Sequence, residues 1–126
     1  MRVRIASEIQ VKRRFRLTRS TDFKRVRRLG KSYAHPLVVL YTTGSELPEV
    51  RVGVHASVGV GNAVRRNRAK RLLREAMRLL LADTLAGNDL LLVARSSLPD
   101  SNVQQTRTAL STLLKRAGLI SQTHDG

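Results

Sequence analysis

The chain has 126 residues, enough for one domain with a modest core, and its 41% hydrophobic content excludes a globally disordered protein. Its 24 lysines and arginines outnumber its 9 acids and give a net charge of +15, which favours nucleic acid as partner and an anionic membrane surface second. The lack of cysteine excludes disulfides, thiolate zinc sites and a cysteine nucleophile. No apolar run approaches the ~20 residues of a membrane span, and residues 1–10 lack the apolar core of a secretory signal, so we expect a cytoplasmic protein.

Two basic segments open the chain. Residues 1–14 combine small aliphatic residues with arginine and lysine and lack turn chemistry, which predicts a mobile basic arm; a short edge strand is the alternative. Residues 15–30 predict a helix that has Phe23 and Val26 on one face and Gly30 just after its last turn. This first helix also carries several arginines.

Two strands are expected next. Residues 37–43 are rich in β-branched and aliphatic side chains and end before a turn cluster at residues 44–48. Residues 50–56 alternate apolar and polar side chains, as a half-buried strand does. Because the two segments follow each other along the chain, the sequence predicts an antiparallel hairpin with a long loop.

A long basic helix is the most distinctive predicted element. Residues 63–78 contain no proline or glycine and consist largely of good helix formers, with Asn62 or Gly61 as the N-cap. On a helical wheel, one face is apolar and docks on a core, whereas the opposite face is cationic. The apolar face holds Ala69, Leu72, Leu73, Ala76, Leu79 and Leu80, and the cationic face holds Asn67, Arg68, Lys70, Arg71, Arg74 and Arg78.

The last third of the chain predicts a strand and a helix. Residues 90–94 form a continuous apolar run, short enough for a buried strand. The last helix begins near Ser101, which stands at capping-box spacing from Gln104, and residues 120–126 are expected to fray. The order helix, strand, strand, helix, strand, helix predicts one α+β sandwich over residues 15–119, with one sheet face open or partly open.

The cationic face of the long helix favours a polyanionic partner. A helix face that only meets solvent mixes charges, because like charges three or four residues apart repel each other. Here Glu75 is the only acid between Gly61 and Ala82, and we expect it to pair with Arg71 or Arg78. A nucleic-acid surface is therefore favoured over plain solvation of this face.

Few residues of the sequence offer catalytic chemistry. The 9 acids are scattered, and no two stand at a spacing that would converge on a metal ion within one predicted element. His35, His55 and His124 are each alone, without a metal-binding motif. His55 is either an RNA contact or, as we favour, a polar-face residue of its strand. The pattern therefore favours binding over catalysis by the protein.

The two phenylalanines and two tyrosines all lie in the first third of the chain, among basic residues. Unpaired bases stack on aromatic rings, whereas phosphates are bound by arginine and lysine. Tyr41 on its strand and Phe23 on the preceding helix are therefore candidates for lining a common groove. A core position is the alternative, and for Phe23 the two interpretations are balanced.

Residues 61–75, which read Gly-Asn-Ala-Val-Arg-Arg-Asn-Arg-Ala-Lys-Arg-Leu-Leu-Arg-Glu, resemble the Arg-Asn-Arg signature of the bacterial ribonuclease P protein subunit. Shorter stretches agree at residues 16–30, 51–53 and 89–95, so the resemblance covers roughly residues 12–119. It implies an α/β sandwich with a left-handed β-α-β crossover, whereas the general physical rule favours right-handed crossovers.

The resemblance also implies a function. In that family the RNA subunit is the catalyst and uses magnesium ions (Mg2+) to hydrolyse the bond joining the 5′ leader to precursor tRNA, while the protein binds the catalytic RNA and the leader. For this chain the resemblance implies catalytic-RNA contacts from Arg65, Arg66, Asn67, Arg68, Lys70, Arg71 and Arg74, and a leader-binding cleft at Phe23, Arg27 and Tyr41. It implies neither a catalytic residue nor a metal ligand in the protein, and no further protein partner.

Three features depart from the family pattern. Arg27 stands where many members have a second aromatic residue, so we expect an ionic rather than stacked leader contact there. Val58 and Gly59 stand where many members have a lysine pair, so a phosphate contact of the loop before the long helix is not expected here. Residues 1–10 precede the usual start of such proteins, and we expect that they are dispensable or that translation begins near Val11.

Two other functions fit parts of the sequence. A structural ribosomal RNA-binding protein would share the size and charge, but it needs no cleft for a mobile single strand. A self-sufficient nuclease is disfavoured because the carboxylates are scattered. The signature at residues 66–75 and the aromatic groove favour the ribonuclease P cofactor over both.

Overall fold

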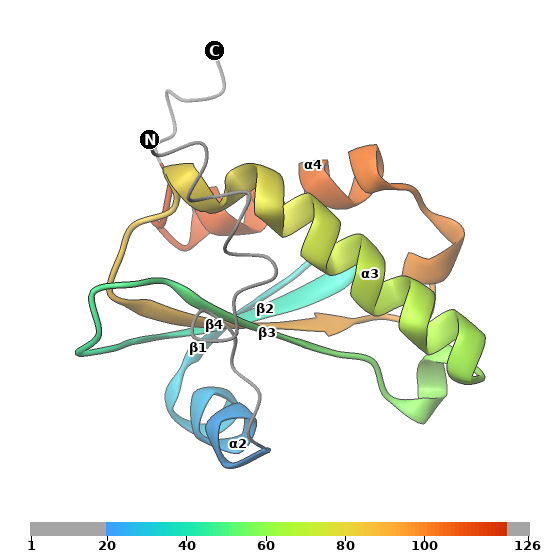
Figure 1. The fold of residues 1–126 in the computed structure, drawn as a ribbon, viewed down its shortest axis with the longest axis horizontal. Helices are drawn as coiled ribbons and strands as arrows, with labels where there is room; N and C mark the ends of the chain where they lie inside the picture. Colours follow the sequence, from blue (N-terminus) through green and yellow to red (C-terminus); the bar gives the residue numbers. More distant parts are fainter. Residues whose placement is uncertain (1–19, 121–126) are drawn as a thin grey trace.

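A four-stranded mixed sheet organises residues 20–120, the part of the chain that the computed structural model describes (Figure 1). The strands lie in the order β1-β2-β4-β3. They span Lys31–Ala34 (β1), Val38–Gly44 (β2), Arg51–His55 (β3) and Asn88–Ala94 (β4). The predicted arm at residues 1–14 lies outside the described residues, as does the tail beyond residue 120.

Helices cover both faces of this sheet. Figure 1 shows α2 on one face and α3 and α4 side by side on the other. The helices span Ser20–Leu29 (α2), Ala63–Leu80 (α3) and Val103–Arg116 (α4), and short 3-10 turns span Val58–Val60 (η2), Leu81–Asp83 (η3) and Leu98–Asp100 (η4). The α+β class predicted from the sequence is confirmed. Within residues 20–120, no helix is both long and apolar enough to cross a membrane.

The predicted hairpin between residues 37–43 and 50–56 is wrong. Strand β4 lies between these segments, antiparallel to β2 and parallel to β3. Residues 90–92 of β4 are at most 1% exposed, and only a central strand buries successive side chains on both faces of a sheet. β3 carries Arg51 and His55 and takes the edge instead.

The hairpin that forms joins β1 to β2, and the sequence pattern does not predict β1. This strand has four residues with mostly exposed side chains, so it lacks a hydrophobic period. His35 organises the turn: its backbone N–H donates to Val38 O at 2.9 Å, and its ring Nδ1 accepts from the Leu37 N–H at 3.0 Å. The strand count is therefore one higher than expected.

Helix α3 connects β3 to the parallel strand β4, so the structure contains the β-α-β crossover that the resemblance implies. The left hand of this crossover stays a prediction. The crossover places the N-terminus of α3 beyond the end of β3 and returns the chain to the centre of the sheet. It therefore sets the long basic helix across one face of the sheet.

The larger core lies between the sheet and helices α3 and α4. Successive strand residues point to opposite faces, so Leu90 and Leu92 enter this core whereas Leu91 packs with Val26 of α2. The buried residues of α3 are Ala69, Leu72, Leu73, Ala76, Met77 and Leu80, spaced by three and four residues. Leu79, predicted on the apolar face, is 43% exposed because it lies beside this stripe.

Capping residues begin both long helices. Asn62 caps α3 as predicted, since its Oδ1 accepts a backbone N–H at 3.0 Å. The capping box of α4 is formed by Asn102 and Gln105 instead of the predicted Ser101 and Gln104. Ser101 is buried, and its hydroxyl lies on the preceding turn, so the helix starts one residue later than expected.

Gly30 follows the last turn of α2, as predicted, for a steric reason. Its backbone N–H donates to Val26 O at 2.8 Å. A Cβ at this position would lie 2.5 Å from Val26 O and 2.6 Å from Thr42 O, so a side chain would meet backbone on both sides. The glycine thus lets the end of α2 lie directly against β2.

Candidate nucleic-acid interface

The polar residues of α3 divide into an outer stripe and two flanks. Asn67, Arg71 and Arg74 are exposed and share one stripe, because they are four and three residues apart. Arg65 and Arg68 lie on the flank that faces residues 96–101. Arg66 and Lys70 are half-buried on the opposite flank. The predicted RNA-contacting residues therefore do not form one uniform surface.

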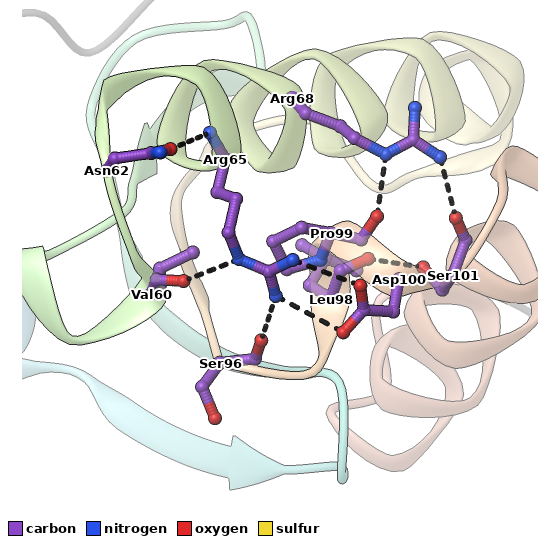
Figure 2. Close-up of polar contacts among 9 residues, drawn as sticks. All are labelled: Val60, Asn62, Arg65, Arg68, Ser96, Leu98, Pro99, Asp100 and Ser101. Carbon is purple, nitrogen blue, oxygen red and sulfur yellow. Dashed lines mark hydrogen bonds and ion pairs between the residues drawn. The ribbon is translucent and has the colours of Figure 1, made fainter.

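Arg65 is bound to the chain's own turn at residues 96–101 (Figure 2). Its guanidinium donates to the two carboxylate oxygens of Asp100 at 3.0 and 3.2 Å, and to the carbonyl oxygens of Val60 at 3.1 Å and Ser96 at 3.2 Å. These hydrogen bonds hold the pKa of Asp100 below its ordinary value and raise the pKa of Arg65. Arginine has five N–H donors, so these four contacts leave Arg65 one for another partner.

Gly61 provides the space for this arrangement. Its φ is +138°, a conformation that side-chain-bearing residues rarely adopt, and a Cβ there would lie 2.7 Å from Arg65 Cδ. The glycine before the N-cap of α3 therefore lets Arg65 fold back toward η2. The sequence gives no local signal for this role.

Arg68 binds the same turn with two of its donors (Figure 2). Its Nε–H donates to Pro99 O at 2.6 Å, and an Nη–H donates to Ser101 O at 3.0 Å. The residue remains exposed, and three of its five N–H donors have no protein acceptor among residues 20–120. Arg68 can therefore hold the turn and face a phosphate at the same time.

The opposite flank of α3 leaves one buried polar group without a protein partner among residues 20–120. The Nε atom of Arg66 is buried and has no hydrogen-bond partner within the described part of the chain. Lys70, one turn further along, carries a charge that acts on His55 of β3. This flank therefore turns toward the edge of the sheet at β3.

The three predicted cleft residues come together on the α2 side of the sheet. Phe23 and Tyr41 are half-buried and pack on the small core of Val26 and Leu91. The guanidinium carbon of Arg27 lies 5.4 Å from the centroid of the Tyr41 ring, a cation–π arrangement. Because Phe23 and Arg27 are four residues apart on α2, both reach the same strip of the sheet.

His55 also belongs to this cluster, although sequence analysis favours a plain polar-face position. Its ring centroid lies 6.4 Å from that of Phe23, with the ring planes at 78°, an edge-to-face contact. Burial, together with the charges of Arg27 and Lys70, lowers the pKa of His55 below its ordinary value of 6.5. The signal missing from the sequence is the pairing of β3 with β4, which decides what His55 faces.

Asp89 fixes α2 to the sheet, a role with no sequence signal. Its carboxylate is buried and accepts from Arg25 of α2 at 2.7 Å and from Arg51 of β3 at 3.0 and 2.9 Å. Burial raises the pKa of Asp89, but the hydrogen bonds from Arg51 and Arg25 outweigh it and leave the pKa lowered. This network sets the position of the helix that carries Phe23 and Arg27.

Sequence and structure comparisons agree on the relationship of this chain. The family model of ribonuclease P matches residues 11–118. The chain belongs to the ribonuclease P protein family. It is 41% identical over 105 residues to the "Ribonuclease P protein component" of Clostridium botulinum (strain Loch Maree / Type A3), covering 82% of this chain and 95% of the relative. It is 38% identical to the same component of Herpetosiphon aurantiacus over 104 residues, covering 82% and 85%.

Solved structures of the ribonuclease P family share the fold. The RNase P protein of Staphylococcus aureus superposes with a TM-score of 0.76 at 32% identity, covering 85% of this chain and 98% of that one. The RNase P protein of Thermotoga maritima gives a TM-score of 0.72 at 28% identity, covering 80% and 96%. The four-stranded sheet with its β-α-β crossover is therefore the family fold.

Several acids in the described part of this ribonuclease P family member form ion pairs with arginines. The predicted pairing of Glu75 on α3 is confirmed with Arg78, at 2.6 Å. Asp89 and Asp100 are bound as described above. Within residues 20–120, no three histidine, aspartate or glutamate side chains gather into a group that could hold a metal ion. The described residues therefore do not fit a protein-bound magnesium site.

Proposed function

We propose that the chain is the protein cofactor of a bacterial ribonuclease P ribonucleoprotein, acts in the cytoplasm, and supports endonucleolytic removal of the 5′ leader from precursor tRNA. The observation that carries this is that one small domain presents two chemically different surfaces, each of which suits RNA. A basic helix face suits the phosphates of a folded RNA, whereas an aromatic and cationic cleft suits an unpaired strand. Family membership supports both assignments.

The basic helix binds the catalytic RNA. Its exposed stripe offers Asn67, Arg71 and Arg74, and the flank toward β3 adds Arg66 and Lys70. Arg68 contributes the donors that the turn leaves open. Arg65, with four donors engaged, chiefly orders the start of the helix. The net charge of +15 brings the two macromolecules together at long range.

The cleft on the α2 side binds the leader. Phe23 and Tyr41 offer half-buried rings on which unpaired bases stack. Arg27 supplies the ionic contact predicted where many family members have an aromatic residue. The leader is thus held on the face of the sheet opposite the basic helix (Figure 1), with Phe23 beside His55 of the edge strand β3.

The chemistry belongs to the RNA subunit. Mg2+ ions held mainly by that RNA supply the activated water for hydrolysis of the phosphodiester. Three described acids, Glu75, Asp89 and Asp100, are bound by arginines, which suits a binding protein. The chain's own contribution is to bind the RNA, to orient the leader and to raise the affinity of the ribonucleoprotein for precursor tRNA.

Reconstitution tests this proposal. The protein is mixed with a bacterial ribonuclease P RNA and precursor tRNA at low magnesium, and cleavage is compared with that of either component alone. We expect cleavage only with both, and we expect Tyr41→Ala to weaken precursor binding about 5- to 100-fold while mature tRNA binds as before. Stimulation that is absent, or cleavage by the protein alone, would contradict the proposal; tight binding to ribosomal RNA with no stimulation would favour the ribosomal alternative.

A further inference from the structure

His55 lies where the leader cleft meets the basic flank of α3. It is the last residue of edge strand β3, so no further strand covers its outer side among residues 20–120. Phe23 of α2 contacts its ring edge-to-face from one side. The charges of Arg27 on α2 and Lys70 on α3 act on it from two different helices. His55 therefore lies at the edge of the sheet between the two proposed RNA-binding surfaces.

The chemistry of His55 differs from that of its neighbours. Its side chain is half-buried, and neither ring nitrogen has a hydrogen-bond partner within residues 20–120. Burial and the nearby cations Arg27 and Lys70 lower the pKa, which favours the neutral imidazole at physiological pH. A neutral imidazole offers one donor and one acceptor, whereas lysine and arginine only donate. Base edges present both donors and acceptors, so this ring suits a base rather than a phosphate.

We propose that His55 contacts a nucleobase of the leader strand and extends the cleft from Tyr41 and Phe23 toward Lys70. The inference rests on the proposed leader-binding function. A strand that crosses Tyr41 and Phe23 and continues to His55 runs between the cations Arg27 and Lys70, which neutralise its phosphates. The position of His55 on a strand edge, fixed by Phe23, makes the contact specific to one nucleotide of the leader.

A double-mutant cycle between the protein and the leader tests this contact. The reconstituted holoenzyme, with wild-type protein or His55→Ala, is titrated with precursor tRNAs that carry one abasic site at successive leader positions. We expect His55→Ala to weaken binding of the intact precursor about 3- to 10-fold. At one leader position, the abasic site should lower the affinity of the wild-type holoenzyme several-fold. The same abasic site should not lower the affinity of the His55→Ala holoenzyme any further.

Two further variants separate the roles of the ring. His55→Phe keeps an aromatic ring without hydrogen-bonding groups, so we expect it to bind the precursor but to lose discrimination among the four bases at that position. His35→Ala is the matched control, because His35 lies in the β1–β2 turn and its ring accepts a hydrogen bond from the Leu37 backbone. It should leave the abasic-site pattern of the wild type unchanged. Circular dichroism checks that each variant is folded.

Three outcomes would overturn the inference. One is the absence of coupling between His55→Ala and an abasic site at every leader position. Another is an equal loss of affinity for mature tRNA, which would make the effect structural. The third is a wild-type holoenzyme without preference for precursor, which would also remove the proposed function. A leader preference abolished by Tyr41→Ala, with no His55 coupling, would leave the proposed function intact and reject this inference alone.

Discussion

The arginines of α3 differ in what their guanidinium groups meet. Arg65 gives four of its donors to the protein, and Arg68 gives two, whereas Arg71 lies exposed on the outer stripe. A residue whose donors are engaged internally supports the fold, and one that faces solvent is available for the proposed RNA contact. Substitution along a single helix therefore separates the two roles.

Replacing Arg71 by alanine should weaken RNA binding with little effect on stability. Each lost phosphate contact makes the slope of log affinity against log salt shallower by about one. Replacing Arg65 should instead lower the melting temperature, because Asp100 and two carbonyl groups lose their donors, and should leave the slope nearly unchanged. Salt titrations of RNA binding and thermal melts measure the two effects. If replacing Arg65 changed the salt slope and replacing Arg71 lowered the melting temperature, Arg65 would be the RNA contact and Arg71 the structural residue.

Asp89→Asn should destabilise the domain by about 3–5 kcal/mol, the usual cost of breaking a buried charge pair. Arg25 and Arg51 would both lose a charged acceptor at the junction of α2 and the sheet. Urea denaturation at pH 7 measures the loss. Asp100→Asn is the control: its carboxylate is 70% exposed, so a much smaller loss is expected. Equal losses would contradict a special role for the buried carboxylate.

The same carboxylate makes stability depend on pH. The pKa of Asp89 is lower in the folded than in the unfolded chain, where its ordinary value is 3.8. Its contribution is therefore fully present above about pH 4 and is lost as the pH falls through the lower, folded-state pKa. Denaturation between pH 5 and pH 2 should show this loss in the wild type and not in Asp89→Asn. Parallel curves for the two proteins would refute the linkage.

At the scale of elements, the position of α2 decides whether a cleft exists. The helix has little buried surface of its own: Val26 is its buried residue, and Phe23 is half-buried. Its position depends on the Asp89 network and on the close approach of Gly30 to β2. The proposed leader-binding cleft is therefore sensitive to changes that leave α3 and the main core intact.

Gly30→Ala should lower stability by about 1–3 kcal/mol, the usual cost of overpacking, and should weaken leader binding. The added Cβ would lie 2.5–2.6 Å from two backbone oxygens, which cannot move without shifting α2 or β2. Affinity for the catalytic RNA, which we propose binds to α3, should change little. Gly44→Ala is the matched control, because a Cβ there would meet nothing within 4 Å. Precursor binding and denaturation curves of both variants provide the comparison.

At the scale of the whole molecule, the high net charge destabilises the folded domain. With a net charge of +15, the positively charged side chains of this small domain repel one another, and Glu75, Asp89 and Asp100 already pair with nearby arginines. Added salt screens this repulsion. The melting temperature of the free protein should therefore rise by a few degrees, about 4 °C for each kcal/mol gained, between 20 mM and 300 mM salt. A lower melting temperature at high salt would show that the ion pairs dominate over the repulsion.

The sequence predicts elements with a strong local signal and misses those defined by pairing. The α3 helix, its Asn62 cap and the Glu75–Arg78 ion pair follow from residues close together in the chain. The sheet order does not, because β4 enters between two strands that precede it by dozens of residues. β1 escapes prediction because four mostly exposed residues carry no hydrophobic period.

The same division applies to the candidate site. Phe23, Arg27 and Tyr41 are proposed from residue type and family resemblance, and the structure brings them together. His55 joins them only because β3 takes the sheet edge next to α2. Likewise, the hydrogen bond from Arg65 to Asp100 joins residues that are 35 positions apart in the sequence, so no local pattern predicts it.

The sequence by itself determined the α+β class, the family and the two-faced basic helix. Periodicity, composition and short motifs are local properties, so they can be read along the chain. Only the tertiary structure decided which arginines of that helix face outward, which carboxylate holds α2 and which histidine borders the cleft. Those outcomes depend on strand order and long-range contacts, which packing of the whole core selects.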